Sequence, residues 1–441
     1  MVYNNSYMRN NIIYEGADQL IYEIREIVNV AQKIEKTGVN ISWENIGDPV
    51  AKGEKVPQWM KDIVADTVRN DNGSFAYSPT KGLLATREYL AKERNIEGGA
   101  QITPEDILFF NGLGDAISKV YTYLNSQARV IGPSPAYSTH SSAEAGHANT
   151  PHITYKLDPN NHWYPDLEDL RTKIKANKNI DGILLINPDN PTGLVYPEKI
   201  LKKIVSIADE FKLFIIADEI YSNLCYGGAE HKNLASVIGD VPGLALRGIS
   251  KEFPWPGSRC GWAEFYNCDK DKDFARYTKT LLDAKMLEVC STTLPQKVLP
   301  YIMSDPRYRP YLKERRDRYQ KKSEIAYEIL SKIPELIINK PQGAFYMTIV
   351  FKDGVLNAEQ KLLPANPAAG KIIEKISQTD KLDKRFVYQL LASSGICVVP
   401  LSSGFNSDLY GFRLTLLEFD ADKFRKIIET IAGAIREYIS Q

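Results

Sequence analysis

Five polar side chains near the middle of the chain are of the types that could carry out covalent chemistry together. They are a lysine amine, a carboxylate, a phenol, an amide and a guanidinium: Lys251, Asp218, Tyr221, Asn190 and Arg259. The stretches that carry them are Asn-Pro-Asp-Asn-Pro-Thr-Gly (187–193), Ala-Asp-Glu-Ile-Tyr (217–221) and Ser-Lys-Glu-Phe-Pro-Trp-Pro-Gly-Ser-Arg (250–259). An amine for a Schiff base, a partner for a ring nitrogen and a clamp for a phosphate together predict pyridoxal 5'-phosphate as cofactor.

Lys251 is the candidate for the covalent bond, because its amine can condense with an aldehyde and, once free, can move protons. A Ser-Lys pair alone is more often a surface lysine. Asp218 suits the pyridinium nitrogen, although an Asp after an apolar strand could also cap a helix or bind a metal. Tyr221, three residues later, favours the cofactor site, since its phenol and the Asn190 amide can reach the ring's 3-oxygen.

Other residues could bind anionic groups. Arg259 can hold a phosphate through two parallel hydrogen bonds. Asn-Gly-Leu-Gly-Asp-Ala (111–116) follows an apolar segment and opens a helical one, so its backbone N–H groups would form an anion site. Arg413, in Gly-Phe-Arg-Leu-Thr-Leu, could receive an α-carboxylate, and a surface salt bridge on an edge strand explains it equally well.

The apolar segments between these motifs predict an α/β fold with a mostly parallel sheet. Segments 107–110, 129–131, 183–186, 213–217 and 244–249 are short, apolar and without alternation, as strands buried on both faces are. Helical stretches such as 197–211 fit right-handed crossovers between them. Asn190, Asp218 and Lys251 each follow such a strand, so we expect them to meet at the carboxyl edge of the sheet.

An N-terminal arm and two domains are expected from the length of 441 residues and from the change in sequence pattern along the chain. Residues 1–15 form the arm, 57–307 the large domain, and 16–56 with 308–441 a smaller α+β domain. An amphipathic helix is predicted over 18–36, packed on its own protein because its polar face is not basic.

The smaller domain is predicted to hold a long charged helix, three strands and a terminal helix. We place the helix at 311–333, the strands at 344–350, 396–400 and 412–416, and the cap of the terminal helix at Asp420. The polar stretch 352–384 is interpreted as an insertion with one short helix.

Composition narrows the class of protein. Lys plus Arg equals Asp plus Glu at 55 each, so no global charge favours nucleic acid or a membrane as partner. Five scattered cysteines without metal-ligand spacing predict reduced thiols, no metal site and a cytoplasmic location. The sequence shows no signal peptide and no apolar run of membrane-spanning length.

Together the motifs resemble the fold type I pyridoxal-phosphate enzymes, specifically the aspartate aminotransferase superfamily (class I/II aminotransferases). The resemblance extends from Ile46-Gly-Asp-Pro to Arg413 and implies a seven-stranded-type sheet sandwiched by helices. It assigns the Schiff base to Lys251, the ring nitrogen to Asp218, and the 3-oxygen to Asn190 and Tyr221. Arg259 corresponds to the phosphate arginine.

The resemblance also assigns roles that the motifs alone do not. Gly112, Leu113 and Gly114 resemble the phosphate loop, Tyr137 the aromatic stacked on the ring, and Tyr77 a tyrosine that reaches the phosphate of the other subunit of a homodimer. Gly47 and Arg413 resemble contacts of the substrate carboxylate. Gly248 stands where many relatives carry a phosphate-binding hydroxyl, and Ser250 is expected to take part of that contact.

The predicted function is an aminotransferase that moves an amino group from an L-amino acid to a 2-oxo acid through the Lys251 Schiff base. A pyridoxal-phosphate lyase on the same scaffold, either a carbon–sulfur β-lyase or an aminocyclopropane carboxylate synthase-like enzyme, is the alternative, because the cofactor residues would be identical. A transcriptional regulator is disfavoured, since no helix-turn-helix or basic patch precedes Gly47. The sequence shows no second arginine for a dicarboxylate substrate.

Overall fold

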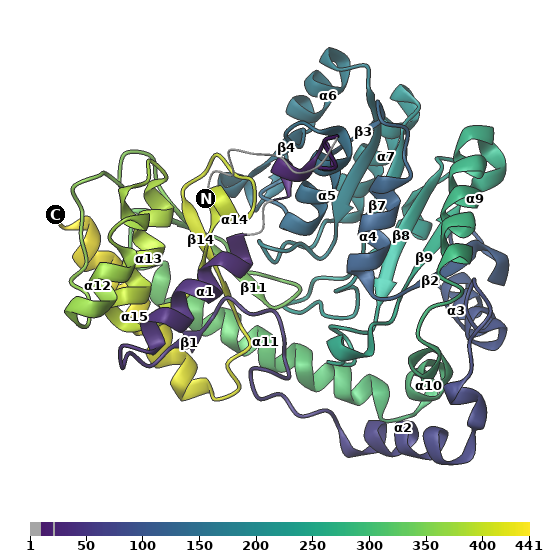
Figure 1. Ribbon diagram of the computed structural model, residues 1–441, viewed down its shortest axis with the longest axis horizontal. Coiled ribbons are helices and arrows are strands. Elements are labelled where there is room, and N and C mark those ends of the chain that lie inside the picture. The colour runs from purple at the N-terminus through teal and green to yellow at the C-terminus, as the bar shows by residue number, and fades with distance from the viewer. Residues whose placement is uncertain (1–9, 21–22) are drawn as a thin grey trace.

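The structure, a computed structural model, describes residues 10–20 and 23–441. Within them the largest sheet has eight strands in the order β2-β9-β8-β7-β6-β3-β4-β5 (Figure 1). The strands are β2 (Ile107–Phe110), β3 (Arg129–Ser134), β4 (Thr154–Asp158), β5 (Tyr164–Pro165), β6 (Ile180–Ile186), β7 (Phe214–Asp218), β8 (Gly243–Gly248) and β9 (Gly261–Tyr266). The five from β8 to β4 in that order run parallel, while β9, β2 and β5 pair antiparallel. The predicted mostly parallel sheet is confirmed, and the two-residue β5 adds an eighth strand.

Helices cover both faces of this sheet, which explains the apolar, non-alternating strands. Successive residues of β6 divide between two cores: Leu184 and Ile186 belong to one, Ile183 and Leu185 to the other. The first core includes residues of α4 and α9, and the second includes residues of α3, α6, α7 and α10. Strands buried on both faces are apolar at every position.

The helices around the sheet have the following bounds: α2 (Gln58–Asn70), α3 (Leu84–Ile96), α4 (Leu113–Thr122), α5 (Ser138–Ala148), α6 (Leu167–Ala176), α7 (Glu198–Phe211), α8 (Leu234–Val237), α9 (Lys272–Leu287) and α10 (Thr293–Ser304). Six short 3-10 helices lie among the described residues of this part and just before it: η1 (Ala17–Gln19), η2 (Asn72–Phe75), η3 (Pro104–Asp106), η4 (Pro159–Asn161), η5 (Pro256–Ser258) and η6 (Cys268–Lys270). The predicted crossover helix at 197–211 corresponds to α7.

A second, four-stranded antiparallel sheet lies toward the other end of the molecule (Figure 1). Its order is β10-β11-β14-β13, and a separate parallel pair joins β1 to β12. The strands are β1 (Ser42–Trp43), β10 (Leu336–Ile338), β11 (Tyr346–Phe351), β12 (Ile396–Cys397), β13 (Val399–Pro400) and β14 (Gly411–Thr415). The helices are α1 (Glu23–Glu35), α11 (Tyr308–Leu330), α12 (Pro367–Ile373), α13 (Leu382–Ser394), α14 (Leu401–Gly404) and α15 (Ala421–Ile439), with η7 (Ile376–Gln378).

The predicted long helix, strands and terminal helix appear in the predicted order, with shifts of a few residues at the ends, whereas β10 and the 13-residue helix α13 were not predicted. The cap of the last helix is confirmed, because the Asp420 carboxylate accepts hydrogen bonds from two N–H groups of its first turn. The helix predicted over 18–36 begins at Glu23; residues 21–22 of that prediction, and residues 1–9 of the predicted arm, lie outside the described residues. The stretch 352–384 holds the short helix α12, followed by η7 and the start of α13.

No helix in the ranges 10–20 and 23–441 combines the length and apolar composition that crossing a membrane requires. The same ranges hold no group of three or more His, Cys, Asp or Glu side chains placed to ligate a metal ion.

Candidate active site

A pocket of about 500 Å³ lies where β6, β7 and β8 end, between the two sheets. Most of the side chains predicted from the sequence line it together: Lys251, Asp218, Tyr221, Asn190, Tyr137, Arg259, Leu113, Gly114, Ser250, Arg413 and Gly47. Parallel strands that end at one edge bring such distant residues together. Gly112 and Tyr77 are not among the lining residues.

Lys251 follows β8 and reaches across the pocket, where its Nζ donates a hydrogen bond to the Gly47 carbonyl oxygen at 2.6 Å. Burial lowers the pKa of this amine to about 8, and the guanidinium of Arg413 acts in the same direction; the Asp48 carboxylate opposes them. An amine with such a pKa is about one-tenth uncharged at pH 7 and about half uncharged at pH 8, far more than a lysine with the ordinary pKa. It is therefore a better nucleophile than an exposed lysine.

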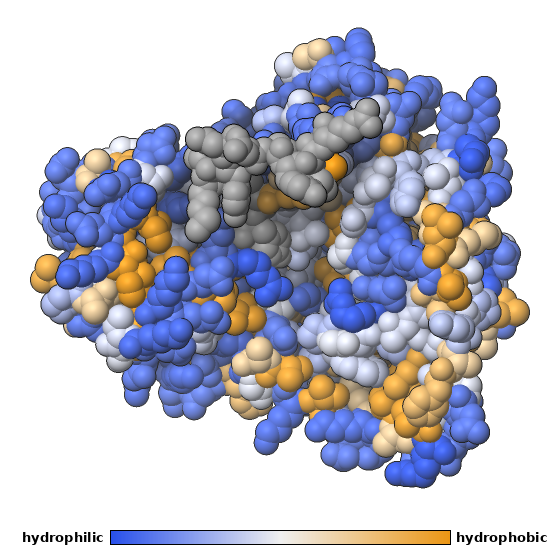
Figure 2. Space-filling model, viewed as in Figure 1, coloured by the Kyte–Doolittle hydropathy of each residue, from blue (hydrophilic) through white to orange (hydrophobic). Residues whose placement is uncertain are grey.

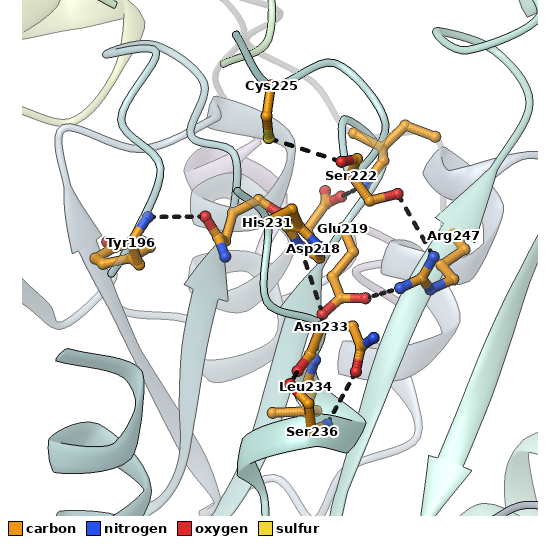
Figure 3. Close-up of polar contacts among 12 residues, drawn as sticks. Tyr196, Asp218, Glu219, Ser222, Cys225, His231, Asn233, Leu234, Ser236 and Arg247 are labelled. Carbon is orange, nitrogen blue, oxygen red and sulfur yellow. Dashed lines mark hydrogen bonds and ion pairs between the residues drawn. The ribbon is translucent and has the colours of Figure 1, made fainter. Parts of the chain in front are cut away.

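Asp218 and Glu219 are neighbours in sequence that serve opposite sides of the sheet (Figure 3). Asp218 shares a face with Ile216, toward α4 and α5, whereas Glu219 lies on the other side and pairs with Arg247. Glu219 also accepts a hydrogen bond from the Leu234 N–H. The two-residue period of a strand thus places one carboxylate in the pocket and the other in a structural ion pair.

The pocket carboxylate is held by a buried histidine that the sequence motifs did not indicate. His140 Nε2 lies 3.1 Å from Asp218 Oδ2, and the backbone N–H of Ile220 donates to Oδ1 at 3.1 Å. The other ring nitrogen of His140 lies 3.1 Å from the Tyr121 hydroxyl. His140 comes one helical turn after Tyr137, and from that spacing its place beside the pocket could have been predicted.

The side of the pocket toward the small sheet is built around Arg413 and Tyr346. Arg413 is 2% exposed, and its guanidinium donates to Asn190 Oδ1 at 3.0 Å and to the Asn45 carbonyl at 2.5 Å. Its charge also lies 4.3 Å from the ring centre of Tyr346. The Tyr346 hydroxyl is 3.0 Å from that of Tyr221. Arg413 has no acidic side chain within ion-pair distance among the residues the structure describes. The alternative interpretation of Arg413, as a partner in a surface salt bridge, is therefore wrong.

Gly47 allows a close approach in the same region. A Cβ at this position would lie 2.2 Å from the Tyr346 hydroxyl oxygen. Any side chain would therefore push Tyr346, and with it the contact to Tyr221, out of place.

The opposite end of the pocket is suited to an anion. The N-terminus of α4, which starts at Leu113, presents unpaired backbone N–H groups, and Arg259 lies beside it. Gly112 has φ +83°, and a Cβ there would lie 2.5 Å from a nitrogen of the Arg259 guanidinium. A Cβ on Gly114 would meet nothing within 4 Å, which leaves space in front of the helix. Gly112 thus serves the pocket by making room for Arg259.

The charges around the pocket favour anionic ligands. Four lining side chains are basic (Arg25, Lys251, Arg259 and Arg413), and two are acidic (Asp48 and Asp218). Such an excess in a concave site raises the local concentration of anions. Phosphates and carboxylates are therefore the groups this pocket is fitted to bind.

Helix α1 contributes a wall of the pocket that sequence reasoning missed. Ile24, Arg25 and Val28 line it. The helix is fastened by Glu23, which accepts a hydrogen bond from the Tyr388 hydroxyl at 2.9 Å and pairs with Lys384. Arg25 is exposed toward the pocket side and has no carboxylate within ion-pair distance in the described parts of the chain. It is thus available to a ligand.

Tyr77 lies apart from the pocket and is 83% exposed. Its role was predicted for a second subunit, so a single chain does not test it.

Known proteins resemble this chain over most of its length. The sequence pattern described as aminotransferase class I and II matches residues 44–431. An uncharacterized aminotransferase of Methanocaldococcus jannaschii is 58% identical over 98% of this chain and 100% of its own length. Glutamate-pyruvate aminotransferase AlaA of Escherichia coli is 30% identical over 75% of this chain and 80% of its own.

Solved structures give the same result. An alanine aminotransferase from Pyrococcus furiosus superposes with a TM-score of 0.82 at 25% identity, covering 97% of this chain and all of its own. These relatives are named as aminotransferases, and none of these findings supports the lyase alternative. The chain is therefore an aminotransferase and belongs to the class I and II aminotransferase family.

Proposed function

We propose that this aminotransferase works with pyridoxal 5'-phosphate, held in the pocket through Lys251, Asp218 and Arg259. When bound, the cofactor supplies an aldehyde carbon that condenses with amines and a ring that accepts electrons. The observation that carries the proposal is the Lys251 amine, buried in one pocket with Asp218 and with its pKa lowered to about 8.

The donor set of the pocket fits this group from end to end. The α4 N-terminus with Leu113, Gly114 and Arg259 suits the phosphate, and Ser250 adds a hydroxyl nearby. Asp218, oriented by His140, suits a protonated ring nitrogen. The hydroxyl of Tyr221 and the amide of Asn190 suit the ring's 3-oxygen, and Tyr137 lines the wall where a ring would stack.

In the reaction, Lys251 has two tasks: it forms the covalent attachment, and its freed Nζ then takes the proton from the substrate α-carbon. Arg413 holds the substrate α-carboxylate beside Lys251, with its orientation fixed by Asn190 and Asn45. A guanidinium held by neutral partners keeps its charge available to a carboxylate. Gly47 admits the substrate because it has no side chain.

We propose glutamate as one amino donor and a small 2-oxo acid such as pyruvate as acceptor. Two observations support this choice. Relatives of this chain are named glutamate-pyruvate and alanine aminotransferases. Arg25 lines the pocket without an acidic partner among the described residues, which suits a second carboxylate.

We also propose that the enzyme is a homodimer, with Tyr77 contributing to the partner's site. Large apolar side chains are exposed on two adjacent segments: Phe75, Tyr77, Met286, Leu287 and Val289. Hydrogen bonds from Thr80 to Val289 and from Thr293 to Ala76 join the segments. Figure 2 shows hydrophobic residues at the surface around α2 and α10, next to this region. Exposed apolar patches of this kind are typical of protein interfaces.

The proposed division into an arm (1–15), a large domain (57–307) and a small domain (16–56 with 308–441) agrees with the two sheets. The eight-stranded sheet lies within residues 107–266, and the four-stranded sheet within residues 336–415.

The five cysteines are all unpaired, which supports a cytoplasmic location.

Titration of the holoprotein with a panel of L-amino acids tests the proposed function. We expect glutamate to change the cofactor's visible absorption and to release one 2-oxo acid per site, with no further turnover until an acceptor is added. Continuous release of ammonia and pyruvate from an amino acid, without an acceptor, would identify a lyase instead.

A further inference from the structure

Arg315, on helix α11, is a fully buried guanidinium that contacts the main chain of Lys251. Its Nη1 donates to the carbonyl oxygens of Lys251 and Glu252 at 2.7 and 2.8 Å. Both carbonyls lie just after β8 ends, where the sheet no longer supplies partners for them. Buried carbonyls without partners are costly, so this contact fixes the backbone from which the Lys251 side chain starts.

Glu54 is the counter-ion of this arginine. Arg315 Nε donates to one Glu54 oxygen at 2.6 Å, and Nη2 donates to the other at 3.2 Å and to the Tyr319 hydroxyl at 3.0 Å. With the two carbonyls, all five N–H groups of the guanidinium have partners. The carboxylate is 6% exposed, and the neighbouring guanidiniums hold the pKa of Glu54 below its ordinary value despite burial. A guanidinium whose five N–H donors all have partners is held in a single orientation.

Glu54 also belongs to the segment that contacts the other end of Lys251. Backbone hydrogen bonds from Lys52 to Asp48 and from Glu54 to Pro49 close a tight turn directly after Gly47. The Gly47 carbonyl accepts the hydrogen bond from Lys251 Nζ. One ion pair thus connects the main chain of Lys251 with the segment that meets its amine.

We propose that Arg315, oriented by Glu54, is a positioning residue for Lys251, holding both its backbone and the facing Gly47 segment. This inference rests on the proposed function of Lys251 as the residue that attaches the cofactor. A misplacement of reacting groups by about 1 Å can cost about 100-fold in rate. Loosening Arg315 should therefore lower the reactivity of Lys251 with little effect on amino-acid binding, which depends on Arg413.

The test compares Arg315→Lys with Arg318→Gln. Lysine keeps the charge opposite Glu54 but carries three donors on one nitrogen instead of five on a planar guanidinium, so it cannot replace all five contacts of Arg315. Arg318 binds the same Glu54 oxygen at 2.6 Å, whereas the carbonyls of Lys251 and Glu252 are bound by Arg315, so Arg318 is the matched control. Glu54→Asp, which draws the carboxylate back by one methylene, is the second variant should Arg315→Lys fail to fold.

Two quantities are measured on each variant. The first is the rate at which the apoprotein attaches added pyridoxal phosphate, trapped with borohydride and assigned to Lys251 by peptide mass. The second is the separate values of kcat and KM for the amino donor. For Arg315→Lys we expect attachment and kcat about 10- to 100-fold slower, with KM within about threefold of wild type. Glu54→Asp should show a smaller loss, and Arg318→Gln should lower the melting temperature alone.

Wild-type attachment and turnover in Arg315→Lys, or equal slowing in Arg318→Gln, would overturn the inference, because the network would then serve stability only. Those results would leave the proposed function intact. Failure of the wild-type apoprotein to attach the cofactor at Lys251 would refute the proposed function and this inference with it.

Discussion

His140 and Asp218 form a buried pair at the base of the pocket, with Nε2 of the imidazole 3.1 Å from Oδ2 of the carboxylate. The Tyr121 hydroxyl occupies the other ring nitrogen. All three groups are satisfied when Tyr121 donates to Nδ1 and the Nε2–H donates to Asp218. The carboxylate is thereby kept as an acceptor, aimed at the position proposed for the cofactor ring.

Replacing His140 with Phe keeps a ring of similar volume and removes both nitrogens. Because a hydrogen bond to a charged group is worth about 1.5–3 kcal/mol, we expect kcat to fall about 10- to 100-fold. Covalent attachment at Lys251 should persist. Steady-state kinetics of the holoenzyme checks this. His152→Phe is the control, since that buried imidazole contacts the Val130 carbonyl and not Asp218; a similar loss of kcat there would contradict the prediction.

The lowered pKa of Lys251 predicts a pH dependence of cofactor attachment. Only the uncharged amine reacts, and its pKa lies at about 8 instead of the ordinary 10.5. The attachment rate should therefore rise about tenfold per pH unit below pH 8 and level off above it. Stopped-flow absorbance after mixing apoprotein with pyridoxal phosphate gives this profile.

Asp48→Asn tests the origin of that pKa. The Asp48 carboxylate is the largest influence that opposes the lowered pKa of Lys251, because it stabilises the ammonium form. Its removal should move the midpoint of the attachment profile below pH 8. A midpoint that moved upward would show that Asp48 does not act on Lys251 through its charge.

Arg25 predicts discrimination between amino donors. If its guanidinium receives the side-chain carboxylate of glutamate, Arg25→Gln should raise KM for glutamate about 10-fold or more, in line with the loss of a charge-assisted hydrogen bond. KM for alanine should stay within about twofold, and Arg25→Lys should recover part of the affinity for glutamate. An equal effect on both amino acids would place Arg25 in a structural role.

The proposed role of Tyr77 predicts complementation between subunits. Tyr77→Ala should weaken cofactor binding, and Lys251→Ala should abolish covalent attachment and activity. In a mixed dimer, the subunit with an intact Lys251 would receive Tyr77 from its partner, so activity should reappear when the two variants are co-expressed. Tandem affinity tags isolate that mixed dimer. No recovery would mean that Tyr77 does not act across an interface.

The sequence allowed prediction of the residues that follow the central strands. Lys251, Asp218 and Asn190 sit in short motifs, and the topology of a parallel sheet brings the ends of its strands to one edge. The two-residue period of a strand also explains why Asp218 faces the pocket while Glu219 lies on the other side of the sheet.

His140, Arg25 and Arg315 were not predicted from the sequence, for a shared physical reason. Each stands on a helix whose rotation and docking are set by packing with distant elements. Arg25 reaches the pocket because Glu23 is tied to α13, and Arg315 because α11 crosses under the end of β8. Helical periodicity identifies a buried face but not the partner against which that face is packed.

Helix α11 runs from beside the large sheet to α15 of the small one as a single rod of 23 residues, about 35 Å long (Figure 1). Arg315 lies near its first turns, about 10 Å from the start. A pivot of about 5° around that start would carry the far end through about 3 Å and the backbone of Arg315 through under about 1 Å. The geometry is that of a lever with its short arm at the lysine: a movement of the C-terminal part of the chain reaches the Lys251 backbone reduced to about a third, and even that fraction approaches the displacement of about 1 Å that can cost about 100-fold in rate.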